Sequence, residues 1–131
     1  MKSSKVYLQR ALAPDKHLGY VKENGEVFRE DPGLNDRIGH VDIFTGRVFR
    51  RRTAAPDKLV GHVDVDNGKI HLEVPASADK YIGRVRTNGE LNLHMAGQLD
   101  VKIGSVKNME SLAQGGGAFL LLVLPAFEEK K

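Results

Sequence analysis

Two histidines and two aspartates come closest to a reactive set in this chain. His40 is followed two residues later by Asp42, and His62 is followed in the same way by Asp64. Imidazole and carboxylate groups are common ligands of zinc and other divalent ions. A fold that joined both pairs could hold a metal, but a scattered histidine is more often a polar surface residue. We therefore predict no bound metal and no other cofactor.

These residues belong to a motif that the chain repeats, with openings near residues 18, 38, 60 and 82. The four copies are LGYVKENGEVFRE, IGHVDIFTGRVFRR, VGHVDVDNGKIHLE and YIGRVRTNGELNLH. A weaker fifth copy, KIGSVKNMESLA, opens near residue 103 and lacks the turn. A fixed period of this kind indicates an architecture of repeated units.

Each full copy has the pattern of a β-hairpin. The second glycine follows Asn24, Thr45, Asn67 or Asn88, and Asn-Gly between short alternating runs is the strongest local signal for a hairpin turn. The apolar position after each turn should build the core, and it is filled by Val27, Val48, Ile70 and Leu91. The first glycine lies inside a strand, where glycine usually marks a bulge or the close approach of another backbone.

Five such glycines at equivalent positions predict hairpins that converge around a common axis. We expect one all-β domain over residues 1–131, with four to five β-hairpin repeats around a pseudo-rotational axis. The terminal strands would close this barrel-like ring, which would leave no exposed edge to aggregate.

The repeated stretches, GYVKENGEVFRED, IGHVDIFTGRVF, VGHVDVDNGKI and IGRVRTNGELNL, resemble the β-flower proteins, small bacterial domains of four or five hairpins around a pseudo-rotational axis. The resemblance covers roughly residues 18–110 and implies a fold. It implies no activity and no functional residues. A more distant resemblance is to the PRC-barrel, whose units also have the apolar-Gly-x-Val pattern, although two such units would be expected there.

The stretch AFLLLVLPAF, residues 118–127, lies outside the repeats. Short apolar runs bounded by Gly and Pro are usually core strands, so we predict a buried strand. An alternative is a detachable strand that pairs with another copy of the chain, with Gly115 to Gly117 as its hinge, and this would produce a homo-oligomer. At ten residues the run is too short for a membrane-spanning helix, which needs about 20.

Composition excludes some chemistry. The chain has no cysteine, so disulfides, thiolate metal sites and cysteine nucleophiles are absent. No secretion signal is evident at the N-terminus, which favours a cytoplasmic location. The net charge is +3, a mild excess that permits contact with an anionic partner without requiring one.

One basic cluster could contact nucleic acid, and it comprises Arg47, Arg50, Arg51 and Arg52. Proteins that bind single strands combine such a groove with stacking aromatic residues. This chain has only five Phe and three Tyr and no Trp. A solvated loop explains the cluster equally well, so we do not expect nucleic acid to be the partner.

Repetition of scaffold residues without a repeated reactive set favours a non-enzymatic module for protein interaction or self-assembly. The alternative is a small-ligand binding domain with its site at the axis or mouth of the ring. Its candidate residues are His40, His62 and Arg84, which occupy the same position in successive copies. Nucleic-acid binding through Arg47 and Arg50 to Arg52 is a weaker alternative.

Overall fold

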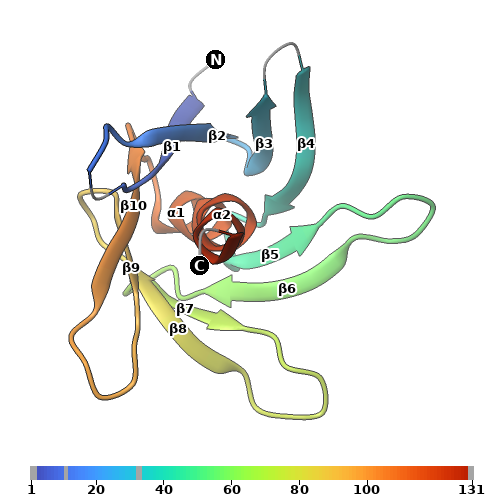
Figure 1. The fold of residues 1–131 in the computed structure, drawn as a ribbon. Helices are drawn as coiled ribbons and strands as arrows, with labels where there is room; N and C mark the ends of the chain where they lie inside the picture. Colours follow the sequence, from blue (N-terminus) through green and yellow to red (C-terminus); the bar gives the residue numbers. More distant parts are fainter. Residues whose placement is uncertain (1–2, 11, 32–33, 130–131) are drawn as a thin grey trace.

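Ten antiparallel strands form a closed barrel in the computed structural model, which describes residues 3–10, 12–31 and 34–129 (Figure 1). The strands are β1 (Ser3–Leu8), β2 (Lys16–Lys22), β3 (Glu26–Asp31), β4 (Leu34–Val41), β5 (Arg47–Arg50), β6 (Lys58–Val63), β7 (Lys69–Leu72), β8 (Lys80–Val85), β9 (Glu90–Leu93) and β10 (Val101–Lys107). Strands consecutive in the chain are neighbours, and β1 closes the barrel against β10. The predicted all-β, barrel-like ring of hairpins is confirmed.

The connections between strands define the two ends of the barrel. Short turns join β2 to β3, β4 to β5, β6 to β7 and β8 to β9 at one end, which we call the turn rim. The other connections lie at the opposite end, the loop rim. The incomplete fifth copy contributes β10, whose hairpin partner is missing from its own repeat, and β1 pairs with β10 in its place. The N-terminal strand therefore completes the ring.

The apolar-Gly pair that opens each copy forms a β-bulge. In β4, Gly39 pairs with Val27 and Arg37 pairs with Phe28, so that Ile38 has no partner on β3. Gly39 also packs closely against the segment inside the barrel, because a Cβ on this glycine would lie 2.8 Å from Cδ1 of Leu121. Both roles expected of a glycine inside a strand, bulge and close approach, are present at one position.

Each turn is hydrogen-bonded to the next hairpin. The backbone N–H of Val63 donates to the carbonyl of Gly46 at 2.8 Å. The same bond, also at 2.8 Å, recurs from Val41 to Gly25, from Val85 to Gly68 and from Val106 to Gly89. The four turn glycines all have positive φ, between 81° and 97°, which is the conformation that Asn-Gly hairpin turns require. The turn motif therefore also couples neighbouring hairpins.

The predicted C-terminal strand is wrong, because this segment is a helix that fills the lumen. It comprises α1 (Leu112–Ala118), the π-helix η1 (Phe119–Val123) and α2 (Leu124–Glu129), and Figure 1 shows it end-on inside the ring of strands. The closed barrel has no free edge for another strand, and a helix satisfies its backbone within the apolar lumen. We call residues 112–129 the central helix.

The proposed glycine hinge is likewise wrong, because Gly115 to Gly117 are buried in the first part of the central helix. A Cβ on Gly117 would lie 2.9 Å from Cγ1 of Val41, and Cβ atoms on Gly115 and Gly116 would overlap the side chains of Val85 and Val63. Only a helix with almost no side-chain volume fits inside this layer of valines. Packing overrides the low helix propensity of glycine.

The π-helix matches its residues to the hairpins one by one. Phe119 packs over Gly83, Leu120 over Gly61 and Leu121 over Gly39. An α-helix turns once in 3.6 residues, whereas the hydrogen bond from the Leu124 N–H to the Phe119 carbonyl spans five. Because the turn of a π-helix is wider, each successive side chain packs against the strand glycine of a different hairpin.

Ser111 and Gln114 fix the start of the central helix. The Ser111 hydroxyl accepts a hydrogen bond from the Gln114 backbone N–H at 3.3 Å. The buried Gln114 amide accepts from the Glu110 N–H at 2.7 Å and donates to the Lys22 carbonyl at 3.3 Å. The spacing Ser-x-x-Gln matches that of a capping box. None of the described helices is long and apolar enough to cross a membrane.

Candidate functional site

His40 and His62 lie on the outer face of the barrel in equivalent surroundings. His40 stacks on Phe49, with ring centroids 4.9 Å apart, and its Nδ1 lies 3.3 Å from a carboxylate oxygen of Asp57. His62 stacks in the same way on His71, also at 4.9 Å, and pairs with Asp79 at 3.4 Å. Each histidine contacts a carboxylate from the loop rim.

The aspartates that follow these histidines in the sequence have a different role. The Asp42 carboxylate accepts hydrogen bonds from the backbone N–H groups of Phe44 at 2.9 Å and Thr45 at 3.2 Å. Asp64 accepts one from the Asp66 N–H at 2.9 Å. These bonds hold the hairpin turns, and the Asp42 bonds lower the pKa of its carboxyl group. The two His-Asp sequence pairs therefore do not form a common site.

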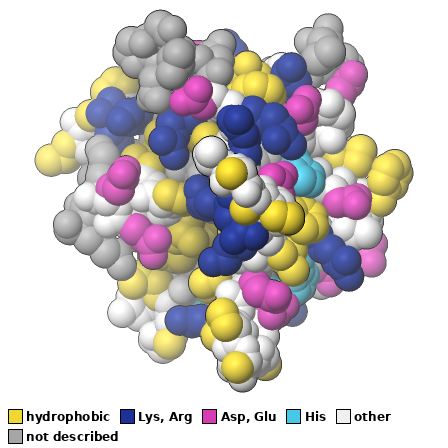
Figure 2. All heavy atoms as spheres, turned by 90° about the vertical axis from the view of Figure 1, so that its right-hand side faces the viewer, with side chains coloured by type: hydrophobic (Ala, Val, Ile, Leu, Met, Phe, Trp, Pro, Cys, Tyr) yellow, Lys and Arg dark blue, Asp and Glu magenta, His cyan; other side chains and the backbone are white. Residues whose placement is uncertain are grey.

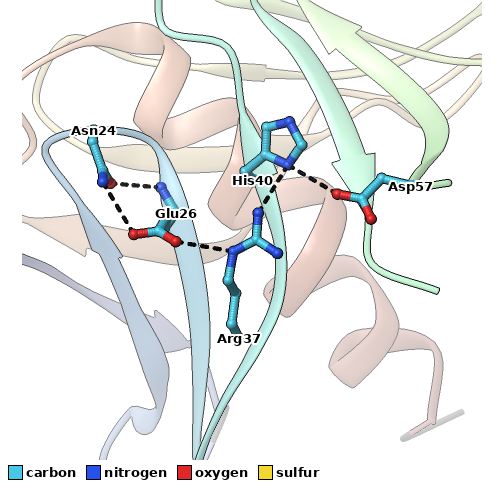
Figure 3. A network of polar contacts seen from close by, with 5 residues as sticks. All are labelled: Asn24, Glu26, Arg37, His40 and Asp57. Carbon is cyan, nitrogen blue, oxygen red and sulfur yellow. Dashed lines mark hydrogen bonds and ion pairs between the residues drawn. The ribbon is translucent and has the colours of Figure 1, made fainter. Parts of the chain in front are cut away.

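His40 belongs to a polar network that runs across neighbouring hairpins (Figure 3). Asn24 donates to Glu26 at 3.0 Å, and Glu26 forms an ion pair with Arg37 at 3.0 Å. The Arg37 guanidinium also lies 3.3 Å from Nδ1 of His40. The hydrogen bond from Asn24 lowers the pKa of Glu26, and the positive charge of Arg37 adds to this effect. The network links the β2–β3 and β4–β5 hairpins, and His40 lies at one end of it beside Asp57.

Arg84 shares the position of the two histidines on β8, and its Nε donates to the Asn67 carbonyl at 3.3 Å. The strands that carry His40, His62 and Arg84 are each separated by one further strand. With about 4.8 Å between strands, their backbones are about 10 Å apart at each step. The three residues occupy a row around the outside of the barrel, and the axis itself is filled by the central helix.

The predicted basic cluster is divided between the two rims. Arg47 begins β5 at the turn rim, opposite His62, whereas Arg50 ends β5 at the loop rim, opposite Lys58. Arg52 donates to the Pro56 carbonyl at 2.8 Å and holds its own loop. Figure 2, seen from the side of the β5–β6 connection, shows Lys and Arg gathered near the middle of this face with Asp and Glu around them. The face carries mixed charge.

The loop rim contains two cavities beside α2. The first has a volume of about 210 Å³ and a polar lining that includes Lys16, His17, Arg29, Glu30 and Glu129. The second has a volume of about 290 Å³ and is mostly apolar. Its lining residues are Leu72, Lys80, Tyr81, Ile82, Leu93, His94, Ala96, Leu124, Phe127 and Glu128. We call the second cavity the mouth groove.

Polar side chains border the apolar floor of the mouth groove. The Tyr81 ring lies 4.8 Å from the His94 ring, centroid to centroid. Nδ1 of His94 is 3.1 Å from a carboxylate oxygen of Asp100. Burial and the nearby negative charge of Asp100 raise the pKa of Tyr81. The Tyr81 hydroxyl therefore stays protonated, and so able to donate a hydrogen bond, to a higher pH than an exposed tyrosine.

The mouth groove does not follow from the sequence pattern, because the apolar segment that forms one wall has the pattern of a buried strand and folds as a helix. Leu124 and Phe127 belong to α2, and no pattern in the repeats places them beside Leu72 and Leu93. A usable signal was present in Ser111 and Gln114, whose spacing indicates the start of a helix. Extending that helix through residue 127 would have carried Leu124 and Phe127 to the far end of the lumen.

Within the described ranges, no group of three or more His, Asp or Glu side chains is arranged to hold a metal ion. Comparison with known protein families, curated proteins and solved structures finds no match to this chain. The resemblance to the β-flower proteins therefore stays a prediction.

Proposed function

We propose that this protein is a non-enzymatic binding domain whose ligand site is the mouth groove. The observation that carries the proposal is a cavity of about 290 Å³ between α2 and strands β7 to β9. Ligand sites often lie in the mouths of β-barrels and combine an apolar lining with a few polar groups. This cavity is close to the smallest volume usual for such sites, about 300 Å³.

The lining suggests a small apolar ligand with one polar group. Leu72, Leu93 and Leu124 are partly buried and pack against the core, so they offer an apolar surface that is already positioned. Tyr81 and His94 stand together at one side and can hydrogen-bond a hydroxyl or carbonyl group.

Titration with 1-naphthol, which has an apolar body and one hydroxyl, tests this proposal by NMR of the leucine methyl groups. We expect saturable shifts at Leu72, Leu93 and Leu124. Leu93→Gln should weaken binding at least tenfold, because it places an amide in the apolar floor. Leu99→Gln is the matched control, since Leu99 is 90% exposed, and its affinity should equal that of the wild type.

Tyr81→Phe keeps the ring and removes only the hydroxyl. Loss of one hydrogen bond predicts a decrease in affinity of about three- to tenfold, with the thermal midpoint nearly unchanged. Methyl shifts that do not saturate, or an equal loss of affinity in the Leu93 and Leu99 variants, would contradict the proposal.

A second candidate function is self-association through the loop rim. Four of the large exposed hydrophobic residues lie on or beside two connections of this rim, namely Leu12, Met95, Leu99 and Val101. The strands β1 and β10, which flank these connections, are neighbours, so the apolar side chains lie on adjacent parts of the rim. Clustered exposed apolar residues mark protein-interaction surfaces more often than single ones do.

Native mass spectrometry of the full chain tests this second candidate. We expect a discrete oligomer that reverts to the monomer in the Leu12→Ser/Leu99→Ser variant. A wild-type monomer at high concentration, or an oligomer that persists in this variant, would exclude self-association through these residues.

A further inference from the structure

A second open groove lies on the outer face of the barrel, over β1 and β2 and away from the mouth groove. Its volume is about 380 Å³, which is within the usual range for ligand sites. Its lining residues are Ser3, Lys5, Tyr7, His17, Tyr20, Lys22 and Glu30. Strand β10, on the other side of β1, adds Lys107 at its edge. We call this surface the lysine groove.

The lysines of this groove form no close ion pairs, although the Glu26 carboxylate is near enough to Lys22 for the lysine charge to lower the pKa of Glu26. Lys5 is directly opposite Lys107 in the β1–β10 ladder, and like charges placed opposite one another destabilise a sheet. Among the described residues, no carboxylate forms an ion pair with Lys5, Lys22 or Lys107. Lys22 and Lys107 instead lie over aromatic rings, 4.7 Å and 5.1 Å from the ring centroids. The groove therefore concentrates positive charge.

The one acidic residue in the lining, Glu30, faces His17 rather than a lysine. A carboxylate oxygen of Glu30 lies 3.3 Å from Nδ1 of His17. Nε2 of His17 is shielded from solvent and has no hydrogen-bond partner. A buried ring nitrogen without a partner is costly.

Two tyrosines give the groove an aromatic wall beside the charges. Tyr20 is directly opposite Lys5 in the β1–β2 ladder, and Tyr7 is opposite His17. Their side chains are half-buried, with Tyr20 stacked on Phe28 at 5.1 Å and Tyr7 tilted against His17 at 5.2 Å. Lysine is a common point-charge partner of phosphate, and the tyrosine rings and hydroxyls can contact the attached organic group.

We propose that the lysine groove binds a small organic phosphate. The phosphate would lie between Lys5 and Lys22, and its organic part would contact Tyr7 and Tyr20. The cavity has the size of a small-molecule site rather than of a long track for a polymer, and this favours a small ester over a nucleic acid. The inference is independent of the mouth groove, because no residue lines both cavities.

Phenyl phosphate is the probe, and its binding is followed by NMR of the tyrosine rings in the full chain. We expect saturable shifts of Tyr7 and Tyr20. Lys5→Gln/Lys22→Gln should weaken binding at least tenfold. The matched control is Lys58→Gln/Lys69→Gln, which removes the same charge at two exposed lysines on other strands and should change affinity less than twofold.

A stability measurement keeps the test decisive. The Lys5→Gln/Lys22→Gln variant should melt close to the wild type without ligand, because relief of the repulsion between Lys5 and Lys107 offsets loss of the Lys22 contact with the Phe28 ring. Phenyl phosphate should raise the thermal midpoint of the wild type and not that of the variant. Absence of saturable shifts at millimolar probe, or equal loss in both double variants, would overturn the proposal. Much tighter binding of an oligonucleotide through the same lysines would assign the groove to a polymer instead and would also overturn it.

Discussion

Gly83 lies directly against the ring of Phe119, and a Cβ built on this glycine would come within 2.9 Å of the ring carbon Cζ. Individual strand glycines of the barrel therefore make room for individual side chains of the central helix. Gly104 makes the same kind of contact with Val123, where the distance from the added Cβ would also be 2.9 Å. Much of the stability of this fold should depend on positions where the barrel has no side chain at all.

Gly46→Ala should destabilise the protein far more than Gly97→Ala. Both glycines have similar positive φ, 81° and 74°, and alanine in this conformation costs about 1 kcal/mol. The added Cβ has open space at Gly97 but would overlap the Val63 carbonyl at Gly46. We expect a loss of about 3 kcal/mol or more at Gly46, measured by urea denaturation. Equal losses in the two variants would exclude the close approach as the cause.

Gly116→Ala should be destabilising although it raises helix propensity. Alanine is favoured over glycine inside a helix by about 1 kcal/mol. The new methyl group would, however, overlap the Val63 side chain, so we expect a net loss of about 2 kcal/mol. In a double-mutant cycle, Val63→Ala makes room, and part of the loss at Gly116 should be recovered. If the losses of stability caused by Gly116→Ala and Val63→Ala were simply additive, the contact between these two residues would be contradicted.

Leu121→Ala should test the lumen assignment of the π-helix. Leu121 is fully buried, whereas Leu99 is 90% exposed. Truncating a buried leucine costs about 2–5 kcal/mol, through lost transfer energy and the cavity it leaves. Leu99→Ala, with the same change in side chain, should alter the free energy of unfolding by less than about 0.5 kcal/mol. Similar values at both sites would contradict a buried central helix.

The stabilising contribution of Asp42 should be lost in acid. Hydrogen bonds from the backbone of Phe44 and Thr45 lower the pKa of the Asp42 carboxyl group below its usual value. A group whose pKa falls on folding stabilises the native state above its unfolded pKa, and this contribution is lost as the pH falls through its folded pKa. Asp42→Asn should therefore lower the thermal midpoint at pH 7, and the difference from wild type should shrink near pH 2.

The control for this prediction is Asp66→Asn in the next turn. Asp66 is exposed, and no hydrogen bond to its carboxylate is found within the described residues. Its replacement should leave the difference from wild type small at both pH values. A pH-independent effect of Asp42→Asn would show that the carboxylate acts only through its shape.

The sequence predicted the barrel well because its signals are local. Asn67 followed by Gly68 requires a tight hairpin turn, and Val27, Val48, Ile70 and Leu91 are all buried, as their position after the turn indicates. The central helix was missed because residues 119–123 are buried on every side. A helix without a polar face has no 3.6-residue period, so it cannot be distinguished from a buried strand by pattern alone.

The candidate sites depended on that helix and on pairing between distant residues. The position shared by His40, His62 and Arg84 is visible in the repeat. The partners of the two histidines, Asp57 and Asp79, come from the loop rim of the following hairpins. The lysine groove joins β1 to strands that the repeat does not place beside it. Closure of the ring therefore determines which surface residues become neighbours, and no single copy of the motif contains that information.

The position of the central helix also has a consequence for biosynthesis. Residues 112–129 leave the ribosome after all ten strands, so the nascent chain must hold a ring of hairpins whose apolar interior has not yet been synthesised. Pairing of β1 with β10 also joins segments about a hundred residues apart in sequence, and such long-range closure is slow. The strands should therefore remain open during translation until the central helix has been synthesised, and the barrel should then close around it.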